Sequence, residues 1–269
     1  HEDINCFLVV PVVSNHKNQK LQVGPTFSDL TLTTLQDELY GNYYALKKIS
    51  LRSGEKYLLQ QDFRVDVSPV RSPFTFKHFY FKSYGGLDPA LYKVFIRDNA
   101  YIDSKDPKIM ALANEIQGSS TNVMKVAHAL HSFVVKYLEY GTPIPGLYTS
   151  GEALRERKVD CGGFDTLFIA LCNAVGIPAR VVSGFWAGYD KNLMHAWAEF
   201  LLPNGEWVAA DPSMEQFFSL GKSRKSGRFG FAGSDRVIFS KGCDIPVVVN
   251  GKKIFPKNIL LKVVGFLKK

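Results

Sequence analysis

The second half of the chain contains three separated residues whose types can together carry out nucleophilic catalysis: Cys161, His195 and Asp211. Cys161 opens a predicted helix, and a helix N-terminus stabilises an anion and therefore favours a thiolate. His195 begins one predicted strand and Asp211 ends the next, so antiparallel pairing places an imidazole beside a carboxylate. That carboxylate would fix the ring tautomer of the base that serves the thiol. The spacing indicates a triad for acyl transfer, and the alternative is that all three are ordinary structural residues.

Two glycines, Gly162 and Gly163, follow the candidate nucleophile. Each glycine costs a helix about 1 kcal/mol relative to alanine, so two at a helix start require a reason. Close approach of a substrate backbone to the sulfur of Cys161 would supply that reason. Cys172, which lies about 16 Å further along the helix axis, is interpreted as a small core residue.

Local signals predict the elements that must position these residues. A helix from Asp160 to Val175 is predicted by apolar residues at helical spacing, and Gly176 and Pro178 end it. Strands are expected over 180–186, 195–202 and 206–210, and the turn 203–205 joins the last two as a hairpin. Earlier helices are expected to begin after the caps Asp88, Asp106, Thr121 and either Thr149 or Ser150.

The first part of the chain is predicted to be β-rich. Strands are expected over 6–13, 43–51 and 57–67 with turn signals between them, which is typical of a small sandwich. Tyr84-Gly85-Gly86 is interpreted as a linker. Helices followed by an antiparallel meander indicate an α+β layout for the rest. We therefore expect an N-terminal β-rich domain over 1–85 and a second domain over 86–269.

Composition excludes several classes of protein. The 269 residues are 46% hydrophobic and 22% charged, which is ordinary for a globular chain. No apolar run reaches the roughly 20 residues of a membrane helix. None of the four cysteines forms a CxxC pair, and His128 and His131 lack a third ligand at useful spacing. We therefore expect no metal or cofactor, and whether Cys6 and Cys243 form a disulfide is left open.

Positive charge is concentrated at the C-terminal end. The formal net charge is +8, and residues 215–269 alone hold 12 Lys and Arg against 3 Asp and Glu. Such an end attracts nucleic acid, anionic lipid or an acidic polymer, or it is simply a solvated basic face. Phe229 and Phe231 lie among these basic residues, but no nucleic-acid-binding module surrounds them. Nucleic acid is therefore not the expected partner.

Four separated motifs resemble those of the transglutaminase-like superfamily of bacterial and archaeal proteins. They are Asp160-Cys161-Gly162, Gly176-Ile177-Pro178-Ala179-Arg180, His195-Ala196-Trp197 and Asp211-Pro212, and they occur in the family's order. The resemblance covers residues 88–212, and the preceding part is similar to the β domain often placed before this core. Val159 departs from the pattern, because the family usually has glycine before the Asp-Cys pair.

The resemblance implies a papain-like α+β core of helices packed on an antiparallel sheet, preceded by a small β-sandwich-like domain. It makes 86–269 a catalytic domain with a basic C-terminal extension, in which Cys161 is the nucleophile, His195 the base and acid, and Asp211 the orienting residue. An attacked amide would give a thioester acyl-enzyme. Backbone N–H groups at the helix start, around Cys161 and Gly162, would form part of the oxyanion hole. Tyr140 is a candidate second donor, and Trp186 and Trp197 are candidate cleft residues.

The same triad supports more than one reaction. We expect hydrolysis of a peptide or isopeptide bond in a protein or peptide substrate, because no EF-hand-like calcium loop of a regulated crosslinker is present. Transamidation of glutamine, glycopeptide deglycosylation and a catalytically silent binding module are the alternatives. An acidic polymer would suit the basic C-terminal end. The chain begins at His1 without a signal-peptide pattern, so a processed, exported origin and the compartment are left open.

Overall fold

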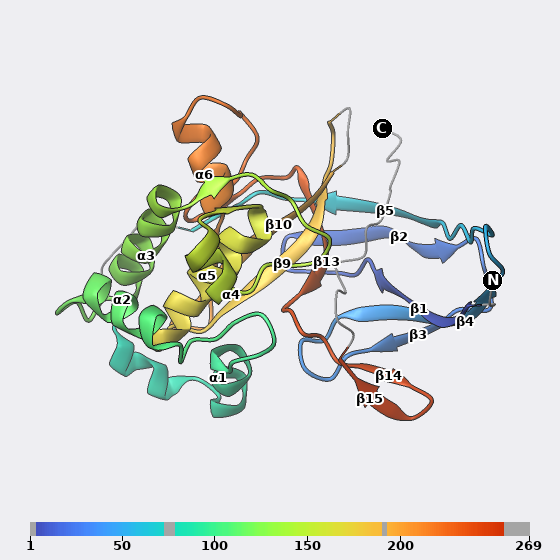
Figure 1. Ribbon diagram of the computed structural model, residues 1–269, viewed down its shortest axis with the longest axis horizontal. Helices are drawn as coiled ribbons and strands as arrows, with labels where there is room; N and C mark the ends of the chain where they lie inside the picture. The colour runs from blue at the N-terminus through green and yellow to red at the C-terminus, as the bar shows by residue number, and fades with distance from the viewer. Residues whose placement is uncertain (1–3, 73–78, 190–192, 256–269) are drawn as a thin grey trace.

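The computed structural model describes residues 4–72, 79–189 and 193–255. Helices gather on one side of a central antiparallel sheet, and the strands of the N-terminal part lie on its other side (Figure 1). The predicted α+β class is confirmed.

The central sheet is built from the strands that carry His195 and lead to Asp211. It has the order β11-β10-β9-β13, with β9 at Ala179–Trp186, β10 at Met194–Leu201, β11 at Trp207–Ala210 and β13 at Arg236–Lys241. The predicted hairpin of β10 and β11 is confirmed, with Leu201 opposite Trp207. The strand β13 was not predicted, and it adds a fourth, antiparallel strand beside β9.

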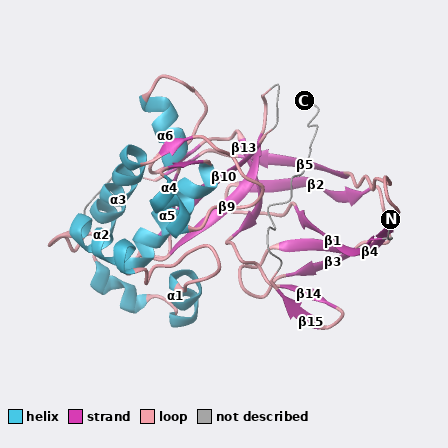
Figure 2. Ribbon diagram, in the orientation of Figure 1, coloured by secondary structure: helices cyan, strands magenta, loops and turns pink. Residues whose placement is uncertain are grey.

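A buried helix, α5 (Cys161–Ala174), packs against this sheet and lies at the centre of the core (Figure 2). Its side chains are fully buried along most of its length, which explains why its sequence is apolar on more than one face. The helices α2 (Pro107–Gln117), α3 (Val123–Tyr137) and α6 (Pro212–Ser219) pack around it. The first residue of α5 is the candidate nucleophile, so the core itself fixes the position of that residue.

The helix starts follow the predicted caps with one correction. Asp88 and Asp106 cap α1 (Pro89–Ile96) and α2, and Thr149 forms a capping box with Glu152 at α4 (Ser150–Glu156). The cap of α3 is Asn122 rather than the predicted Thr121, because the Asn122 side chain accepts the Lys125 N–H at 3.0 Å.

The N-terminal part forms two antiparallel sheets. One has the order β1-β4-β3, with β1 at Ile4–Val12, β3 at Thr33–Gln36 and β4 at Tyr43–Leu51. The other pairs β2 (Gln19–Phe27) with β5 (Gln61–Val67). The expected strand 57–67 is wrong at its start, since β5 begins at Gln61. The strand β2 was missed because much of it is exposed and its sequence includes Gly24 and Pro25.

The segment interpreted as a linker is packed structure. Tyr84 lies in the 3-10 helix η1 (Phe81–Gly86), is buried, and donates its hydroxyl to the Leu201 carbonyl at 2.6 Å. Just before it, β6 (Val70–Arg71) pairs with β12 (Phe231–Ala232). A further apolar cluster joins β5 to β9 and β13. The described residues before position 85 are therefore in extensive contact with the rest, and the domain boundary at residue 85 stays a prediction.

The remaining described elements are short. A two-residue parallel pair joins β7 (Glu139–Tyr140) to β8 (Lys158–Val159), and β14 (Val247–Val249) forms a hairpin with β15 (Lys252–Ile254). Each helix within the described ranges is too short or too polar to cross a bilayer. All four cysteines are free thiols, so Cys6 and Cys243 are not joined.

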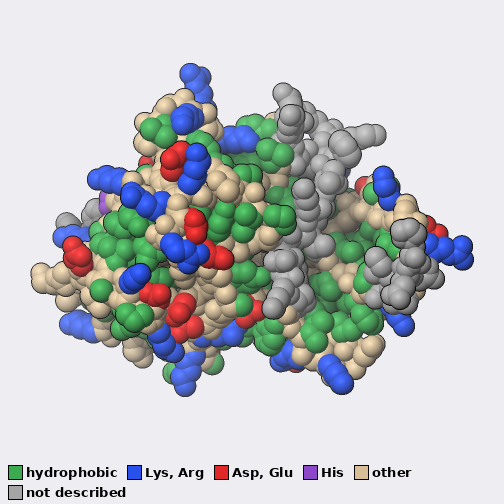
Figure 3. All heavy atoms as spheres, in the orientation of Figure 1, with side chains coloured by type: hydrophobic (Ala, Val, Ile, Leu, Met, Phe, Trp, Pro, Cys, Tyr) green, Lys and Arg blue, Asp and Glu red, His purple; other side chains and the backbone are tan. Residues whose placement is uncertain are grey.

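Basic residues of the C-terminal part do not all lie on a solvated face. Arg236 is buried, and the guanidinium of Arg228 covers the ring of Phe218 at 3.4 Å. Phe229 is buried in the core rather than exposed as a platform. On the face drawn in Figure 3, Lys and Arg side chains are dispersed among Asp and Glu. The four lysines of residues 256–269 lie outside the described residues.

Candidate active site

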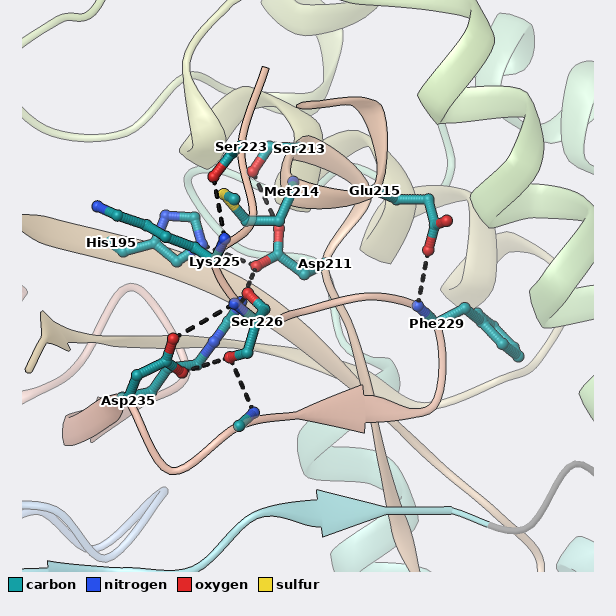
Figure 4. Close-up of polar contacts among 12 residues, drawn as sticks. His195, Asp211, Ser213, Met214, Glu215, Ser223, Lys225, Ser226, Phe229 and Asp235 are labelled. Atoms are coloured by element: carbon teal, nitrogen blue, oxygen red, sulfur yellow. Dashed lines mark hydrogen bonds and ion pairs between the residues drawn. The ribbon is translucent and has the colours of Figure 1, made fainter. Parts of the chain in front are cut away.

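The imidazole of His195 and the carboxylate of Asp211 are in direct contact. His195 lies on β10, Asp211 follows β11 as the cap of α6, and Nε2 lies 2.8 Å from Oδ2 (Figure 4). Both residues are buried. An ionised carboxylate only accepts hydrogen bonds, so Nε2 carries the proton and a neutral ring keeps Nδ1 unprotonated. The pair therefore presents Nδ1 as a base.

Three other contacts hold Asp211 in place. Its Oδ1 accepts the Met214 N–H at 2.9 Å and the Ser213 hydroxyl at 3.0 Å, and its Oδ2 accepts Nη2 of Arg236 at 2.6 Å. Burial alone would raise the pKa of Asp211, but His195 and Arg236 outweigh burial and hold that pKa well below its usual range. Asp211 is thus ionised wherever the protein is folded near neutral pH.

Arg236 is a site residue that sequence reasoning missed. It comes from β13, is 2% exposed, and its guanidinium lies 4.5 Å from the Trp186 ring and 4.9 Å from the Trp197 ring. The Ser226 carbonyl also accepts from Nη2. Gly227 covers the pair so closely that a Cβ there would meet both Arg236 and Asp211. Nothing local in the sequence marks Arg236, because only the pairing of β13 with β9 brings it to Asp211.

The two tryptophans predicted to line the cleft pack on the base instead. Trp186 stacks on His195 with ring centroids 4.6 Å apart and an interplanar angle of 24°. The Trp197 ring centroid lies 6.2 Å from that of His195, with an interplanar angle of 22°. Both are almost completely buried. Burial lowers the pKa of His195, and although Asp211 raises it, the result is a lowered value. The tryptophans therefore help to keep the ring neutral and oriented.

Cys161 lies at the start of α5, against β10. The backbone N–H of Ala196, the residue after His195, is close enough to the sulfur to lower the pKa of the thiol. Burial and the neighbours Asp160 and Asp165 act in the opposite direction and win, so the pKa of Cys161 is raised. The hydrogen bonds of the described residues include none between Cys161 and His195.

The direction of this pKa shift runs against the expectation of a favoured thiolate. The helix N-terminus favours an anion, whereas desolvation and the charge of Asp160 favour the neutral thiol. The shifts of both pKa values favour a neutral thiol and a neutral imidazole.

The two glycines of α5 have a packing role. A Cβ on Gly162 would lie 2.5 Å from Cδ1 of Leu147, and a Cβ on Gly163 would lie 2.6 Å from Cβ of Val159. The first turn of α5 can approach these residues only because both positions lack a side chain. Packing of the helix start thus accounts for the glycines, without the substrate contact that we expected. Val159, the residue that departs from the family pattern, is thus in close contact with Gly163.

Asp165 is a buried acid one turn after Cys161. It is 0% exposed, and neither carboxyl oxygen has a hydrogen-bond partner within the described part of the chain. Burial, reinforced by Asp211, raises the pKa of Asp165 well above its usual value, although Arg236 opposes this. Asp165 is therefore protonated far more readily than an ordinary carboxyl. An acid on an apolar helix stripe was the sequence signal that could have found it.

Tyr140, the candidate second oxyanion donor, lies in β7 near the sulfur. Burial and the neighbouring Cys161 raise the pKa of its phenol, so the hydroxyl keeps its proton. Its backbone N–H donates to Gln216 Oε1 at 3.1 Å, and the Gln216 amide in turn donates to carbonyls at the end of α3. The hydroxyl itself makes no hydrogen bond to a described residue. A protonated, unengaged donor near Cys161 is compatible with the expected role.

The helical histidine pair does not form part of a metal site. His131 is buried between the rings of Phe168 and Phe229, lies against the backbone of Asp211, and burial lowers its pKa to about 3. It therefore supports the segment that carries Asp211. Within the described ranges, no three His, Cys, Asp or Glu side chains converge in a way that could hold a metal ion.

Comparison with known proteins agrees with this fold. Residues 110–212 match the family model of the transglutaminase-like superfamily. A structure from Cytophaga hutchinsonii, described as a candidate cysteine protease, has a TM-score of 0.62 at 18% identity, covering 89% of this chain and 79% of that one. The periplasmic domain of TgpA from Pseudomonas aeruginosa has a TM-score of 0.44 at 16% identity, covering 83% and 74%.

A sequence relative is found in Haemophilus influenzae, where a protein described as uncharacterized is 27% identical over 136 residues. That match covers 39% of this chain and only 36% of the relative, so the chain spans little more than a third of the relative's length. The match to the transglutaminase-like superfamily thus lies in residues 110–212, the part of the chain that carries Cys161, His195 and Asp211. The Cytophaga hutchinsonii structure, at 18% identity, supports the fold and leaves the reaction to be argued from the site.

Proposed function

We propose that the chain is a cysteine-dependent acyl-transfer enzyme that hydrolyses peptide or isopeptide bonds through a thioester on Cys161. The observation that supports this most strongly is the buried contact of His195 Nε2 with Asp211 Oδ2 at 2.8 Å, which leaves Nδ1 as the base. The Ala196 N–H beside the Cys161 sulfur supports a position of the thiol at the same end of β10.

The reaction starts from the neutral pair. As the sulfur of Cys161 attacks the amide carbon, its proton passes to Nδ1 of His195 and a tetrahedral oxyanion forms. The N–H groups at the start of α5 and the Tyr140 hydroxyl are the donors that we assign to that oxyanion. The imidazolium formed at this stage is stabilised by Asp211, whose charge is maintained by Arg236.

Collapse of the oxyanion breaks the carbon–nitrogen bond, and Nδ1 gives its proton to the leaving amine. Water then attacks the thioester while His195 takes a proton from it, and the carbon–sulfur bond breaks to give a carboxylic acid and the free thiol. An amine in place of water would give transamidation with the same residues. We favour water, and the ratio of the two products is part of the test.

The test incubates the full chain with a random-sequence peptide mixture, with and without an added primary amine, and detects products by mass spectrometry. We expect new carboxyl ends in water that depend on Cys161 and are lost in Cys161→Ala. The matched control is Cys6→Ala, which removes a cysteine of β1 remote from the site and should retain cleavage. Equal cleavage by the wild type and Cys161→Ala contradicts the proposal, and exclusive amine incorporation replaces hydrolysis with transamidation.

A further inference from the structure

Lys225 lies beside the catalytic base and is used by none of the steps above. It belongs to the loop that follows α6, and its ammonium lies 4.9 Å from the ring centroid of Trp186 and 4.4 Å from that of Tyr189. The two rings meet edge to face at 5.9 Å. Because Trp186 also stacks on His195, the ammonium is one aromatic ring away from the imidazole.

The ammonium has no anionic partner of its own. Within the described part of the chain, no carboxylate oxygen lies within ion-pair distance of Nζ of Lys225. Asp235 is the acid that attracts it, but Tyr189 and Ser226 occupy both of its oxygens. Tyr189 donates to Oδ2 at 2.6 Å, and Ser226 donates through its N–H and hydroxyl. The structure thus holds a cation between two aromatic faces and leaves its donors unused.

Partial burial makes this arrangement costly without an anion. Lys225 is half-buried, and desolvation lowers the pKa of its ammonium even though Asp235 opposes the change. A charged donor removed from part of its water is stabilised by a carboxylate that brings charge-assisted hydrogen bonds. An unpaired, partly desolvated ammonium fits a carboxylate group better than a neutral or cationic one.

The position of Lys225 decides which half of a substrate it meets. Lys225 lies on the His195 side of the site, and its charge is close enough to lower the pKa of His195. The base that receives the thiol proton gives it to the departing amine, so the leaving group lies on that side while the acyl group is on Cys161. A residue beside His195 therefore faces the leaving amine.

We propose that the ammonium of Lys225, positioned by the rings of Trp186 and Tyr189, forms a carboxylate subsite on the leaving-group side, so that the preferred substrates are amides whose leaving amine carries a carboxylate. This inference rests on the proposed acyl-transfer function and specifies its substrate class. The carboxylate is either the free C-terminus of the released residue or an acidic side chain close to it. Both sources offer the same chemistry to Lys225.

The test compares matched acetylated peptide sets of random sequence. One pair of sets ends in a free carboxylate or an amide, and a second, amide-capped pair contains Asp or the isosteric Asn at one position. We expect the wild type to cleave one carboxylate set with a kcat/KM about tenfold or more above that of its neutral partner, and the pair that shows the preference identifies the source. Salt should weaken the preference because it screens the charge.

Variants separate recognition from a structural role of the same side chain. Lys225→Met should bring the ratio of carboxylate to neutral kcat/KM close to one, and Lys225→Arg should retain it. Lys222→Met, an exposed lysine of the same loop, is the matched control and should leave the ratio unchanged. A wild type without preference, or a Lys225→Met enzyme that loses both activities equally, overturns the subsite.

A binding experiment keeps the subsite testable if no peptide is cleaved. Cys161→Ala protein is titrated with the same carboxylate and amide sets, with and without the additional change Lys225→Met. Tighter binding of a carboxylate set that disappears with Lys225→Met supports the subsite even where cleavage, and with it the proposed function, fails. Equal binding of both partners in each pair contradicts the subsite while leaving acyl transfer intact.

Discussion

At the scale of single residues, the site is a balance between burial and charge. Asp211 is kept ionised by two cationic or hydrogen-bonding neighbours, whereas Asp165, with no partner, is driven towards its neutral form. Cys161 and His195 are both shifted towards neutrality by burial. Both shifts disfavour an ion pair between the thiol of Cys161 and the imidazole of His195.

Asp165→Asn should stabilise the protein at neutral pH. Because the pKa of Asp165 is raised, the folded chain keeps a proton at pH values where the unfolded chain has released it. The unfolded carboxyl has a pKa of about 3.9, so the free energy of unfolding falls as the pH rises above that value. Asparagine removes that loss, and we expect the free energy of unfolding at pH 8 to rise by about 1 kcal/mol or more. Denaturant unfolding between pH 4 and 8 measures it.

The control for this prediction is Asp103→Asn, which changes an exposed carboxylate. It should leave the pH dependence of stability close to that of the wild type. If Asp165→Asn instead destabilises the fold at pH 8, Asp165 has an anionic role that burial alone does not explain.

Arg236→Gln should narrow the pH range of activity. The guanidinium lowers the pKa of His195, so its removal raises that pKa, and the imidazole becomes a free base only at higher pH. We expect the acid limb of the kcat/KM profile to move upward and activity at pH 6 to fall about tenfold. Arg180→Gln is the matched control, because Arg180 is a nearly buried arginine of β9 paired with Glu199. An unshifted acid limb would show that Arg236 only supports the fold.

At the scale of elements, the start of α5 is fixed by close packing against β8 and the segment before α4. Val159 and Gly163 are in such close contact that a single added methyl group cannot be accommodated without movement. This contact sets the approach of the helix that carries Cys161 to the short strand beside it. Val159 and Gly163 together therefore fix the backbone position of Cys161.

Gly163→Ala should destabilise the protein despite the better helix propensity of alanine. Overpacking costs about 1–3 kcal/mol, and the propensity gain of about 1 kcal/mol offsets only part of it. In a double-mutant cycle with Val159→Gly, the alanine should cost less, because the atoms that it would meet are gone. Unfolding free energies of the four proteins measure the coupling.

Gly151→Ala is the control for that cycle, since a Cβ there meets nothing within 4 Å in α4. It should stabilise the protein by up to about 1 kcal/mol. A Gly163→Ala cost that is the same with Val159 and with glycine at that position would contradict the packing explanation.

At the scale of the whole molecule, the N-terminal part is hydrogen-bonded to β13 at the edge of the central sheet. The fully buried amide of Gln19 donates to the carbonyls of Ser14 and Ile238 and accepts the Ile238 N–H at 2.7 Å. Asn42 makes a similar pair of bonds to the backbone of Lys241. These two side chains replace the strand partner that β13 lacks on its outer side.

Gln19→Ala should loosen the N-terminal strands more than the core. It leaves buried backbone groups of β13 without partners, which costs about 1–3 kcal/mol. We expect faster hydrogen exchange in β2 and β5 with little change in α5. Gln22→Ala, an exposed glutamine of the same strand, should change neither. Equal acceleration throughout would mean that the chain opens as one cooperative unit, contrary to the predicted boundary at residue 85.

Features that depend on neighbouring residues could be predicted from the sequence, whereas features created by contacts between distant segments could not. Caps at Asp88, Asp106 and Thr149 and the hairpin of β10 and β11 depend on neighbouring residues, and their predictions are confirmed. The contact of Arg236 with Asp211 depends on β13 crossing the molecule to β9, which no spacing indicates. The neutral state of the thiol depends on burial, which a helix N-terminus alone does not reveal.

The most direct test of the account is the reaction of each cysteine with iodoacetamide in the folded wild type and in His195→Gln, followed by peptide mass spectrometry. If Nδ1 of His195 removes the thiol proton, carbamidomethylation of Cys161 at pH 7.5 should slow about tenfold or more in the variant. Cys6 serves as the internal control and should react equally in both proteins. Equal rates at Cys161 would contradict a base that serves the nucleophile, and with it the proposed acyl transfer.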